Sequence, residues 1–412
     1  MKKLLAVSLA FALFVPAFAG GILDNVTTKG EIQTIGSLLR AEYQNVDVNS
    51  RTVSNRVLFG LGFDLVDDVK ADVTFLNVGY WGSEGAPSNG QSLDDYLNKI
   101  RVVEANVTVD NIFGVLTAKI GRQFYGDENS PVVYYGPTHY KGGISDNFST
   151  GVRDSESADA VVVTYASDSF TANAVYGKLA QQSQPNVNDA NSVLGLDAKY
   201  NVNDSLSLQA YLYNIAYPNS PLFGGESVNI GLYGGKAAYA DDALLVSVEV
   251  AKNYNNPYSN QRPENRPFFY NEGWMVKADA SFKLALEQAD ITPRLTYVHS
   301  EQNFIAVGNY LPGIMTSGFN GQAFSDGRNM RVVNAGVDFK LPALEKFNFA
   351  LEYFAVSYRK EDNPLWIGNE FDLLVKYALN EYVELHTGIA YGTNTIFKEN
   401  PYAGQLGLIV KF

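Results

Sequence analysis

The stretch GQLGLIVKF, residues 404–412, decides the fold. Its apolar side chains alternate with mostly small or polar ones, and the apolar set is Leu406, Leu408, Val410 and Phe412. Alternation with a period of two is the pattern of a β-strand that has one face in an apolar environment. A chain end normally frays unless other residues hold it. The pattern therefore predicts a strand that is paired along its whole length, up to the final aromatic residue.

Residues 1–19, MKKLLAVSLAFALFVPAFA, have the layout of a secretory signal peptide. Two lysines come first, an apolar run follows from position 4 to position 15, and alanines stand at positions 17 and 19. The run is too short to span a membrane as a helix, and no later stretch approaches the ~18 apolar residues that a spanning helix needs. We expect an exported protein whose mature part is residues 20–412. The alternative is a buried N-terminal helix.

Composition narrows the function classes. The net charge is −13, which argues against nucleic acid as a partner because phosphate binding needs a basic surface. There is no cysteine, so neither a disulfide nor a cysteine-ligated metal contributes to stability. The 26 tyrosines, 24 phenylalanines and 36 glycines favour strands and turns. The chain is expected to be all-β and held together by packing and backbone pairing.

Runs of about ten residues with this alternation continue from residue 29 to the end, and about 18 of them can be counted. In RVLFGLGFDL, residues 56–65, every second side chain from Val57 onward is apolar. The connections alternate between short acidic or polar turns, such as 66–69 and 240–243, and long polar loops, such as 82–98 and 300–330. This alternation is typical of a transmembrane up-and-down barrel with short periplasmic turns and long extracellular loops.

Aromatic residues distinguish a membrane barrel from a soluble β-sandwich or a β-solenoid, which also contain strands of period two. On the apolar faces, one aromatic set adjoins the short turns and another adjoins the long loops. The turn-side set is Phe63, Phe170, Tyr200, Phe282, Phe339, Phe349, Tyr377 and Phe412, and the loop-side set is Tyr43, Tyr176, Trp274, Tyr297 and Tyr391. Such girdles bracket the ~25 Å apolar band of outer-membrane barrels. The predicted fold is one transmembrane antiparallel up-and-down β-barrel of about 18 strands, closed by pairing of the last strand with the first.

The C-terminal strand resembles the signal that outer-membrane proteins present to the barrel-assembly machinery, with Leu408, Val410 and Phe412 as its alternating residues. Residues 117–129, TAKIGRQFYGDEN, and 151–165, GVRDSESADAVVVTY, are similar to the Gly-Arg-Gln strand, long loop and Asp-led next strand of alginate-export-type and related porins. The resemblance implies a Gram-negative outer-membrane porin whose partners are outer-membrane lipid, lipopolysaccharide and the assembly machinery. It also implies that the loop after the fifth strand, residues 126–156, is the constriction loop.

A barrel of about 16 to 18 strands is wide enough to leave an aqueous channel. The predicted pore-lining residues lie opposite the apolar faces and are Lys199, Lys277, Asp279, Arg294 and Lys376. The predicted constriction residues in the 126–156 loop are Asp127, Glu128, Tyr134, Tyr135, Lys141, Arg153 and Asp154, and they face Arg56, Lys119 and Arg122. In an alternative that stays open, the loop packs outward as a surface cap. Strict alternation also points Arg122 outward, whereas a bulge at Gly121 turns it into the lumen, as the family pattern implies.

The predicted function is a porin: a water-filled channel for passive diffusion of small hydrophilic solutes and ions across the bacterial outer membrane. An enzyme is not predicted, because His139, His299 and His386 have no neighbours at triad or metal-ligand spacing. No cofactor and no dedicated metal site are expected. The alternatives are a substrate-selective channel for acidic sugars or other small organic solutes, and a structural or adhesive envelope barrel with a plugged lumen. Both a monomer and a homotrimer stay open.

Overall fold

The computed structural model describes residues 25–43, 46–80, 100–127, 130, 132–136, 157–179, 192–220, 226–254, 273–301, 304, 330–360, 363–393 and 400–412. The predicted signal peptide, residues 1–19, lies outside them. Nearly all of the described chain is β-structure, with one 3-10 turn at Pro342–Leu344. None of the helical structure in these ranges is long and apolar enough to cross a membrane.

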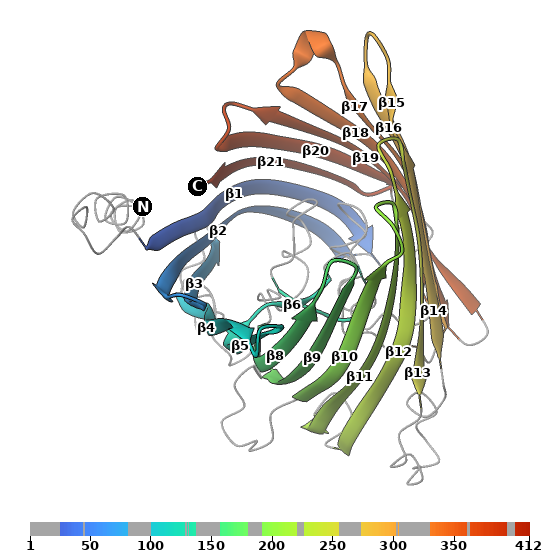
Figure 1. The fold of residues 1–412 in the computed structure, drawn as a ribbon. Helices are drawn as coiled ribbons and strands as arrows, with labels where there is room; N and C mark the ends of the chain where they lie inside the picture. Colours follow the sequence, from blue (N-terminus) through green and yellow to red (C-terminus); the bar gives the residue numbers. More distant parts are fainter. Residues whose placement is uncertain are drawn as a thin grey trace.

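Eighteen strands form one continuous wall (Figure 1). In chain order they are β1 (Val26–Tyr43), β2 (Val46–Val66), β3 (Val69–Tyr80), β4 (Arg101–Ile112), β5 (Leu116–Gln123), β8 (Ala158–Ala166), β9 (Phe170–Leu179), β10 (Ser192–Asn201), β11 (Leu206–Ser220), β12 (Glu226–Ala240), β13 (Leu244–Tyr254), β14 (Trp274–Phe282), β16 (Asp290–Ser300), β17 (Met330–Lys340), β18 (Phe347–Lys360), β19 (Asn363–Ala378), β20 (Val383–Thr393) and β21 (Tyr402–Lys411). The short β15 (Leu284–Ala285) pairs with the start of β16.

Each wall strand pairs antiparallel with the wall strands before and after it in the sequence, and β21 pairs antiparallel with β1. That last pairing runs from Glu31 opposite Lys411 to Arg40 opposite Tyr402, so it spans the whole of β21. The wall is therefore a closed up-and-down barrel without a free edge, and the predicted fold class and strand number are confirmed. Closure satisfies every ladder position of the terminal strand, which is the condition for a strand that lies in hydrocarbon.

The short turns at one end of the barrel are built by side chains that accept backbone hydrogen bonds. The Asp241 carboxylate accepts from the backbone N–H groups of Ala243 and Leu244 at 2.9 and 2.7 Å. These hydrogen bonds lower the pKa of Asp241. Asn203 and Asn380 make the same pair of contacts in their own turns, at 2.8 to 2.9 Å. Asp and Asn favour such turns because the side chain replaces a missing backbone partner.

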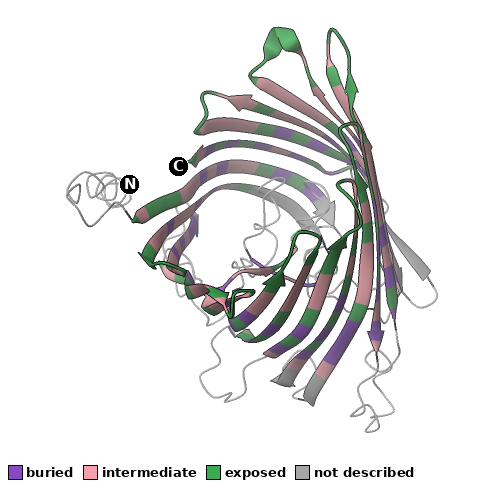
Figure 2. Cartoon of the chain, viewed as in Figure 1, coloured by how far each residue is buried: buried purple, intermediate pink, exposed green. Residues whose placement is uncertain are grey.

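The two faces of the wall differ in chemistry, and buried, intermediate and exposed residues follow one another along the wall strands (Figure 2). Directly opposite residues of an antiparallel pair share a face, so the register assigns each side chain to the outside or the lumen. The outside carries large, exposed apolar side chains; Leu194, Leu196 and Leu406, for example, are 60%, 58% and 63% exposed. All the predicted girdle aromatics except Tyr43, whose side chain is not described, lie on this face. An exposed apolar belt of this extent is a membrane-facing surface.

The barrel closes against Phe412. The Gly30 N–H donates to the Phe412 carbonyl at 2.7 Å, and the Phe412 N–H donates to the Gly30 carbonyl at 3.1 Å. The Phe412 ring lies over Gly30, where a Cβ would stand 2.5 Å from the ring and 2.8 Å from the Leu58 carbonyl oxygen. The ring also contacts Phe59, with centroids 6.2 Å apart. Because Gly30 has no side chain, the Phe412 ring can pack directly against β1.

Substituting Gly30 by Ala is expected to lower the yield of folded barrel, because the added methyl group must displace the Phe412 ring or the backbone of β2. Overpacking of this kind costs about 1–3 kcal/mol. The measurement is the fraction of heat-modifiable, folded protein in electrophoresis and its urea midpoint. Gly36→Ala on the same strand is the control, since its Cβ would meet no atom closer than 3.7 Å. Equal yields for the two variants would show that the packing of the Phe412 ring against Gly30 contributes nothing to barrel closure.

Candidate functional site

The lumen face of the wall is polar and charged. The predicted pore-lining residues all have the register of this face, and they are Lys199 on β10, Lys277 and Asp279 on β14, Arg294 on β16 and Lys376 on β19. Lys277 is buried and pairs with Asp279 at 2.9 Å. The Asp279 carboxylate also accepts hydrogen bonds from Thr296 and Ser247, at 2.8 and 3.2 Å. Charged residues here are arranged as local ion pairs along the wall.

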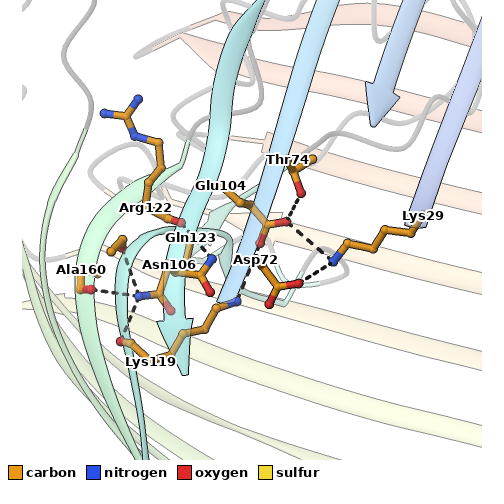
Figure 3. A network of polar contacts seen from close by, with 10 residues as sticks. Lys29, Asp72, Thr74, Glu104, Asn106, Lys119, Arg122, Gln123 and Ala160 are labelled. Atoms are coloured by element: carbon orange, nitrogen blue, oxygen red, sulfur yellow. Dashed lines mark hydrogen bonds and ion pairs between the residues drawn. The ribbon is translucent and has the colours of Figure 1, made fainter. Parts of the chain in front are cut away.

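One network of ion pairs crosses the lumen face of β1, β3, β4 and β5 (Figure 3). At its centre the Glu104 carboxylate, only 6% exposed, accepts a hydrogen bond from the Thr74 hydroxyl at 2.8 Å. The ammonium groups of Lys119 and Lys29 lie 3.7 and 4.0 Å from the same carboxylate. Lys29 also lies 3.7 Å from Asp72. Lys29 therefore lies between the Asp72 and Glu104 carboxylates, and Lys119 approaches Glu104 from β5.

Two further ion-pair groups lie on the lumen face, one on β1 and β2 and the other on β16 to β18. Arg56 on β2 is buried and pairs with Glu31 on β1 at 2.9 Å. Arg294 on β16 contacts two carboxylates, Asp338 on β17 at 2.9 Å and Glu352 on β18. In these groups each cationic side chain lies next to a carboxylate. The charged lining of the lumen is therefore compatible with water.

The first part of the predicted constriction loop folds into the barrel. After Gln123 the chain leaves the wall, and Tyr125–Gly126 (β6) pairs with Tyr134–Tyr135 (β7) as a small hairpin inside the ring of strands (Figure 1). Glycine is required at position 126 because its φ is +99° and a Cβ would stand 2.3 Å from the Val133 carbonyl oxygen. Val132, Val133 and Tyr135 of the hairpin are buried in the main apolar cluster. The described residues of the loop thus lie in the lumen. The alternative, in which the loop packs outward as a surface cap, does not hold for these residues.

Polar contacts hold this hairpin to the wall at strands β10 to β13. The Tyr125 hydroxyl donates to the Asp197 carboxylate at 2.6 Å. The Ser130 hydroxyl donates to Glu249 at 2.7 Å, and Asp127 pairs with Lys236 at 3.1 Å. Burial of Tyr125 next to Tyr213 and Asp197 raises the pKa of its hydroxyl, which therefore stays protonated as a donor. These contacts attach the hairpin to the lumen face of the four strands.

The structure places Arg122 outside the lumen, which corrects its assignment to the constriction. Gly121 has a φ of +124°, yet it pairs with Asn106 on one side and Ala160 on the other without an extra residue. The alternation therefore continues, and Arg122 shares the outer face with Asp159, which it contacts at 2.8 and 2.9 Å. In Figure 3 its side chain points away from Glu104 and Lys119. The turn into the lumen begins after Gln123, whose amide donates to the Ala160 carbonyl at 2.9 Å.

The other predicted constriction residues divide into two groups. Lys119 and Asp127 lie on the lumen side, Tyr135 is buried in the hairpin, and Tyr134 is half-buried beside it. Glu128, Lys141, Arg153 and Asp154 lie outside the described residues. Among the residues that are described, no group of His, Cys, Asp and Glu is arranged to hold a metal ion.

Two tyrosines that contact the same carboxylates as the hairpin were not predicted from the sequence. Tyr211 and Tyr213 on β11 lie on the lumen face, and their hydroxyls contact Glu249 and Asp197. A signal for them exists in the stretch QAYLYNI, residues 209–215, where they alternate with Leu212 on the lipid face. Aromatic residues on the polar face of a barrel strand have no role in a girdle, so they indicate contacts inside the lumen.

No protein-family model matches the sequence, and no curated protein matches it either. Solved structures do match along almost the whole chain. OccAB1 of Acinetobacter baumannii aligns with a TM-score of 0.61 and 13% identity, covering 96% of this chain and 98% of that protein. OpdK of Pseudomonas aeruginosa, solved with vanillate, aligns with a TM-score of 0.60 and 10% identity, covering 95% and 100%. OpdQ of the same organism aligns with a TM-score of 0.58 and 10% identity, covering 95% and 98%.

At these identities the similarity concerns the fold. It gives no specific support to the alginate-export type that residues 117–165 resemble, whereas it agrees with the predicted barrel in strand number and closure. The chain therefore has the fold of the 18-stranded outer-membrane porins.

Proposed function

We propose that this chain forms a water-filled channel in the bacterial outer membrane through which small hydrophilic solutes and ions diffuse passively. The observation that carries the proposal is a closed 18-stranded wall, apolar outside and charged inside, with the described hairpin β6–β7 inside the ring of strands (Figure 1). Barrels of this strand number leave an aqueous channel, whereas about eight strands are filled by their own side chains. In this proposal the assembly machinery inserts the barrel and reads the strand that contains Leu408, Val410 and Phe412.

Two alternatives make different predictions for solute flux. A substrate-selective channel is favoured by the cavity that the hairpin forms with the wall, because a built cavity can discriminate between solutes. Acidic sugars are one candidate class, and other small organic solutes are another. A structural or adhesive barrel with a plugged lumen is the third reading, and it predicts no flux.

Liposome swelling with a panel of sugars and amino acids tests these readings on the folded full chain. A general channel is expected to pass neutral sugars at rates that fall smoothly with solute size. Passage of one chemical class, with exclusion of neutral solutes of equal size, would establish a selective channel. An absence of swelling for every solute, with protein correctly inserted, would establish the plugged barrel and contradict the proposal.

A modest preference for cations is expected at low ionic strength. Carboxylates outnumber cationic groups in the cavity beside the hairpin, where Asp127, Asp197 and Glu249 accompany one lysine, Lys119. A low-dielectric wall concentrates the field of such groups, and screening shortens its range from ~30 Å at 0.01 M salt to ~3 Å at 1 M. Reversal potentials in a salt gradient should show the preference at low salt and its loss at high salt.

The position of Asp127 on the hairpin adds a residue-level expectation. Asp127→Asn should reduce the cation preference more than Glu384→Gln, because Glu384 lies on the wall near the short-turn end, next to His386. Equal reductions for the two variants would show that the hairpin does not line the narrowest part of the pathway.

A further inference from the structure

A cavity of about 500 Å³ lies between the inserted hairpin and the lumen wall. The hairpin contributes Tyr125, Asp127 and Ser130, and the wall contributes residues of β4, β5, β8 to β11 and β13. The cavity is large enough for a small organic solute, since ligand pockets in proteins are commonly about 300–1,000 Å³. It lies on the lumen side of the wall, where the proposed channel would carry a diffusing solute.

Two carboxylates of the cavity are held by neutral hydroxyl and amide groups. Asp197 accepts hydrogen bonds from Tyr125 at 2.6 Å, from Asn173 at 2.8 Å and from Tyr213 at 3.3 Å. Glu249 accepts hydrogen bonds at its Oε1 only, from Ser130 at 2.7 Å and Tyr211 at 2.9 Å. Both carboxylates are therefore fixed in position by donors that carry no charge.

Glu249 has an unused acceptor. The residue is 3% exposed, and its second oxygen, Oε2, is buried without a hydrogen-bond partner. A buried carboxylate oxygen without a partner is costly, because the group has lost its water and gained no donor in exchange. A cationic donor that displaces the side chains covering this oxygen would satisfy it.

The neighbouring lysines already pair with other carboxylates, which indicates that the missing donor carries a positive charge. Lys236 and Lys277 flank Glu249 in register, but they lie 3.1 and 2.9 Å from carboxylates of their own, Asp127 and Asp279. Lys119 also lines the cavity and pairs with Glu104, at 3.7 Å. In the part of the chain that the structure describes, neither Asp197 nor Glu249 forms an ion pair. The cavity lining is thus short of positive charge.

The aromatic rings around these carboxylates also favour a cation. Tyr125, Tyr211 and Tyr213 form a contiguous group in which Tyr213 lies between the other two, with ring centroids 6.3 and 5.8 Å apart. The face of a tyrosine ring attracts an ammonium or guanidinium group within about 6 Å. Carboxylates next to aromatic rings therefore offer an ammonium or guanidinium group an opposite charge and a surface that is partly shielded from water.

We propose that this cavity is a binding subsite for small solutes that carry a primary ammonium or guanidinium group, with the carboxylates of Asp197 and Glu249 as its acceptors. The inference rests on the proposed channel function and adds a substrate class to it. An anion of similar size meets three carboxylates and one paired lysine, so it is repelled. A neutral polyol leaves the charge of Glu249 uncompensated, so it binds weakly.

Isothermal titration of the folded, detergent-solubilised full chain with agmatine tests the site without requiring transport. Agmatine carries one ammonium and one guanidinium group; 1,4-butanediol is the neutral probe and glutarate the anionic one. We expect agmatine to bind, and the other two to bind at least tenfold more weakly. Glu249→Gln keeps the shape of the side chain and its Oε1 acceptor, and should weaken agmatine about tenfold, which corresponds to about 1.4 kcal/mol.

The matched control is Asp338→Asn, which removes one lumen carboxylate on β17, three strands along the wall from Glu249 and outside the cavity lining, where Asp338 contacts Arg294. It should leave agmatine affinity unchanged. Heat modifiability verifies the fold of each variant. If Glu249→Gln does not fold, Asp197→Asn takes its place and should also weaken agmatine binding about tenfold. Agmatine binding no tighter than butanediol, unchanged affinity in the Glu249 variant, or equal weakening by Asp338→Asn would each overturn the subsite.

The same probes separate this inference from the channel itself. Swelling of liposomes without agmatine binding would leave the channel in place and remove the subsite. Agmatine binding without any flux would leave the subsite in place and contradict the channel.

Discussion

Replacement of residues 124–157 by a two-residue Asn-Gly turn is expected to raise the single-channel conductance severalfold. The residues that this turn must join, Gln123 and Ala158, are directly opposite each other on β5 and β8. Opposite Cα atoms of an antiparallel pair are only about 4.5–5.5 Å apart, so a tight turn can connect them without moving the wall. The deletion removes the hairpin from the lumen, and a wider water-filled cross-section carries more current.

A deletion within residues 180–191 is the control, because it shortens the next connection at the same end of the barrel, between β9 and β10, and is expected to leave the conductance unchanged. Folding of both variants is verified by heat modifiability. A conductance that stays at the wild-type level without residues 124–157 would show that the hairpin does not narrow the pathway.

Substitution of Arg294 by Gln is expected to destabilise the barrel by about 3 kcal/mol, the lower end of the cost of breaking a buried ion pair by removing one partner. Arg294 serves two carboxylates at once, Asp338 and Glu352, and the Glu352 side chain is only 4% exposed. Without the guanidinium, Glu352 keeps its charge in a site that water barely reaches. The urea midpoint of the lipid- or detergent-folded barrel measures the loss.

Two variants make this result interpretable. Lys70→Gln breaks an exposed pair with Asp110, whose side chains are 58% and 36% exposed, and should cost at most about 1 kcal/mol. The double variant Arg294→Met, Glu352→Met removes both buried charges and should recover most of the loss, because the carboxylate that remains, Asp338, has a side chain that is 48% exposed and is solvated. If the Arg294 and Lys70 variants lose equal stability, the Arg294–Glu352 pair is as solvated as the exposed Lys70–Asp110 pair.

The barrel could be predicted from the sequence because its determinants are local. Alternation along each strand, turn residues such as Asp241 and Asn380, and aromatics such as Trp274 and Phe282 on one face can all be recognised within a window of about ten residues. Closure by the last strand follows because a barrel in lipid leaves no free edge. The prediction for Arg122 was wrong because a glycine with positive φ does not by itself add a residue to a strand, and pairing on both sides preserved the alternation.

The lumen site could not be predicted because its contacts join residues that are distant in the sequence. Tyr125 and Asp197 are 72 residues apart, and Ser130 and Glu249 are 119 apart. Which lumen residues meet depends on where the hairpin lies inside the barrel, and the period-two pattern contains no information about that position. The inward tyrosines of β11 were the available signal, and they indicate that a contact exists without identifying the partner.

Planar-bilayer recording on the purified, folded chain tests the central claim most directly. The account predicts stepwise insertion events, each followed by a steady, ohmic current, with a modest cation preference that high salt abolishes. Insertion without any current would contradict the account, because it would show that the hairpin and the charged lining plug the barrel instead of lining a water-filled path.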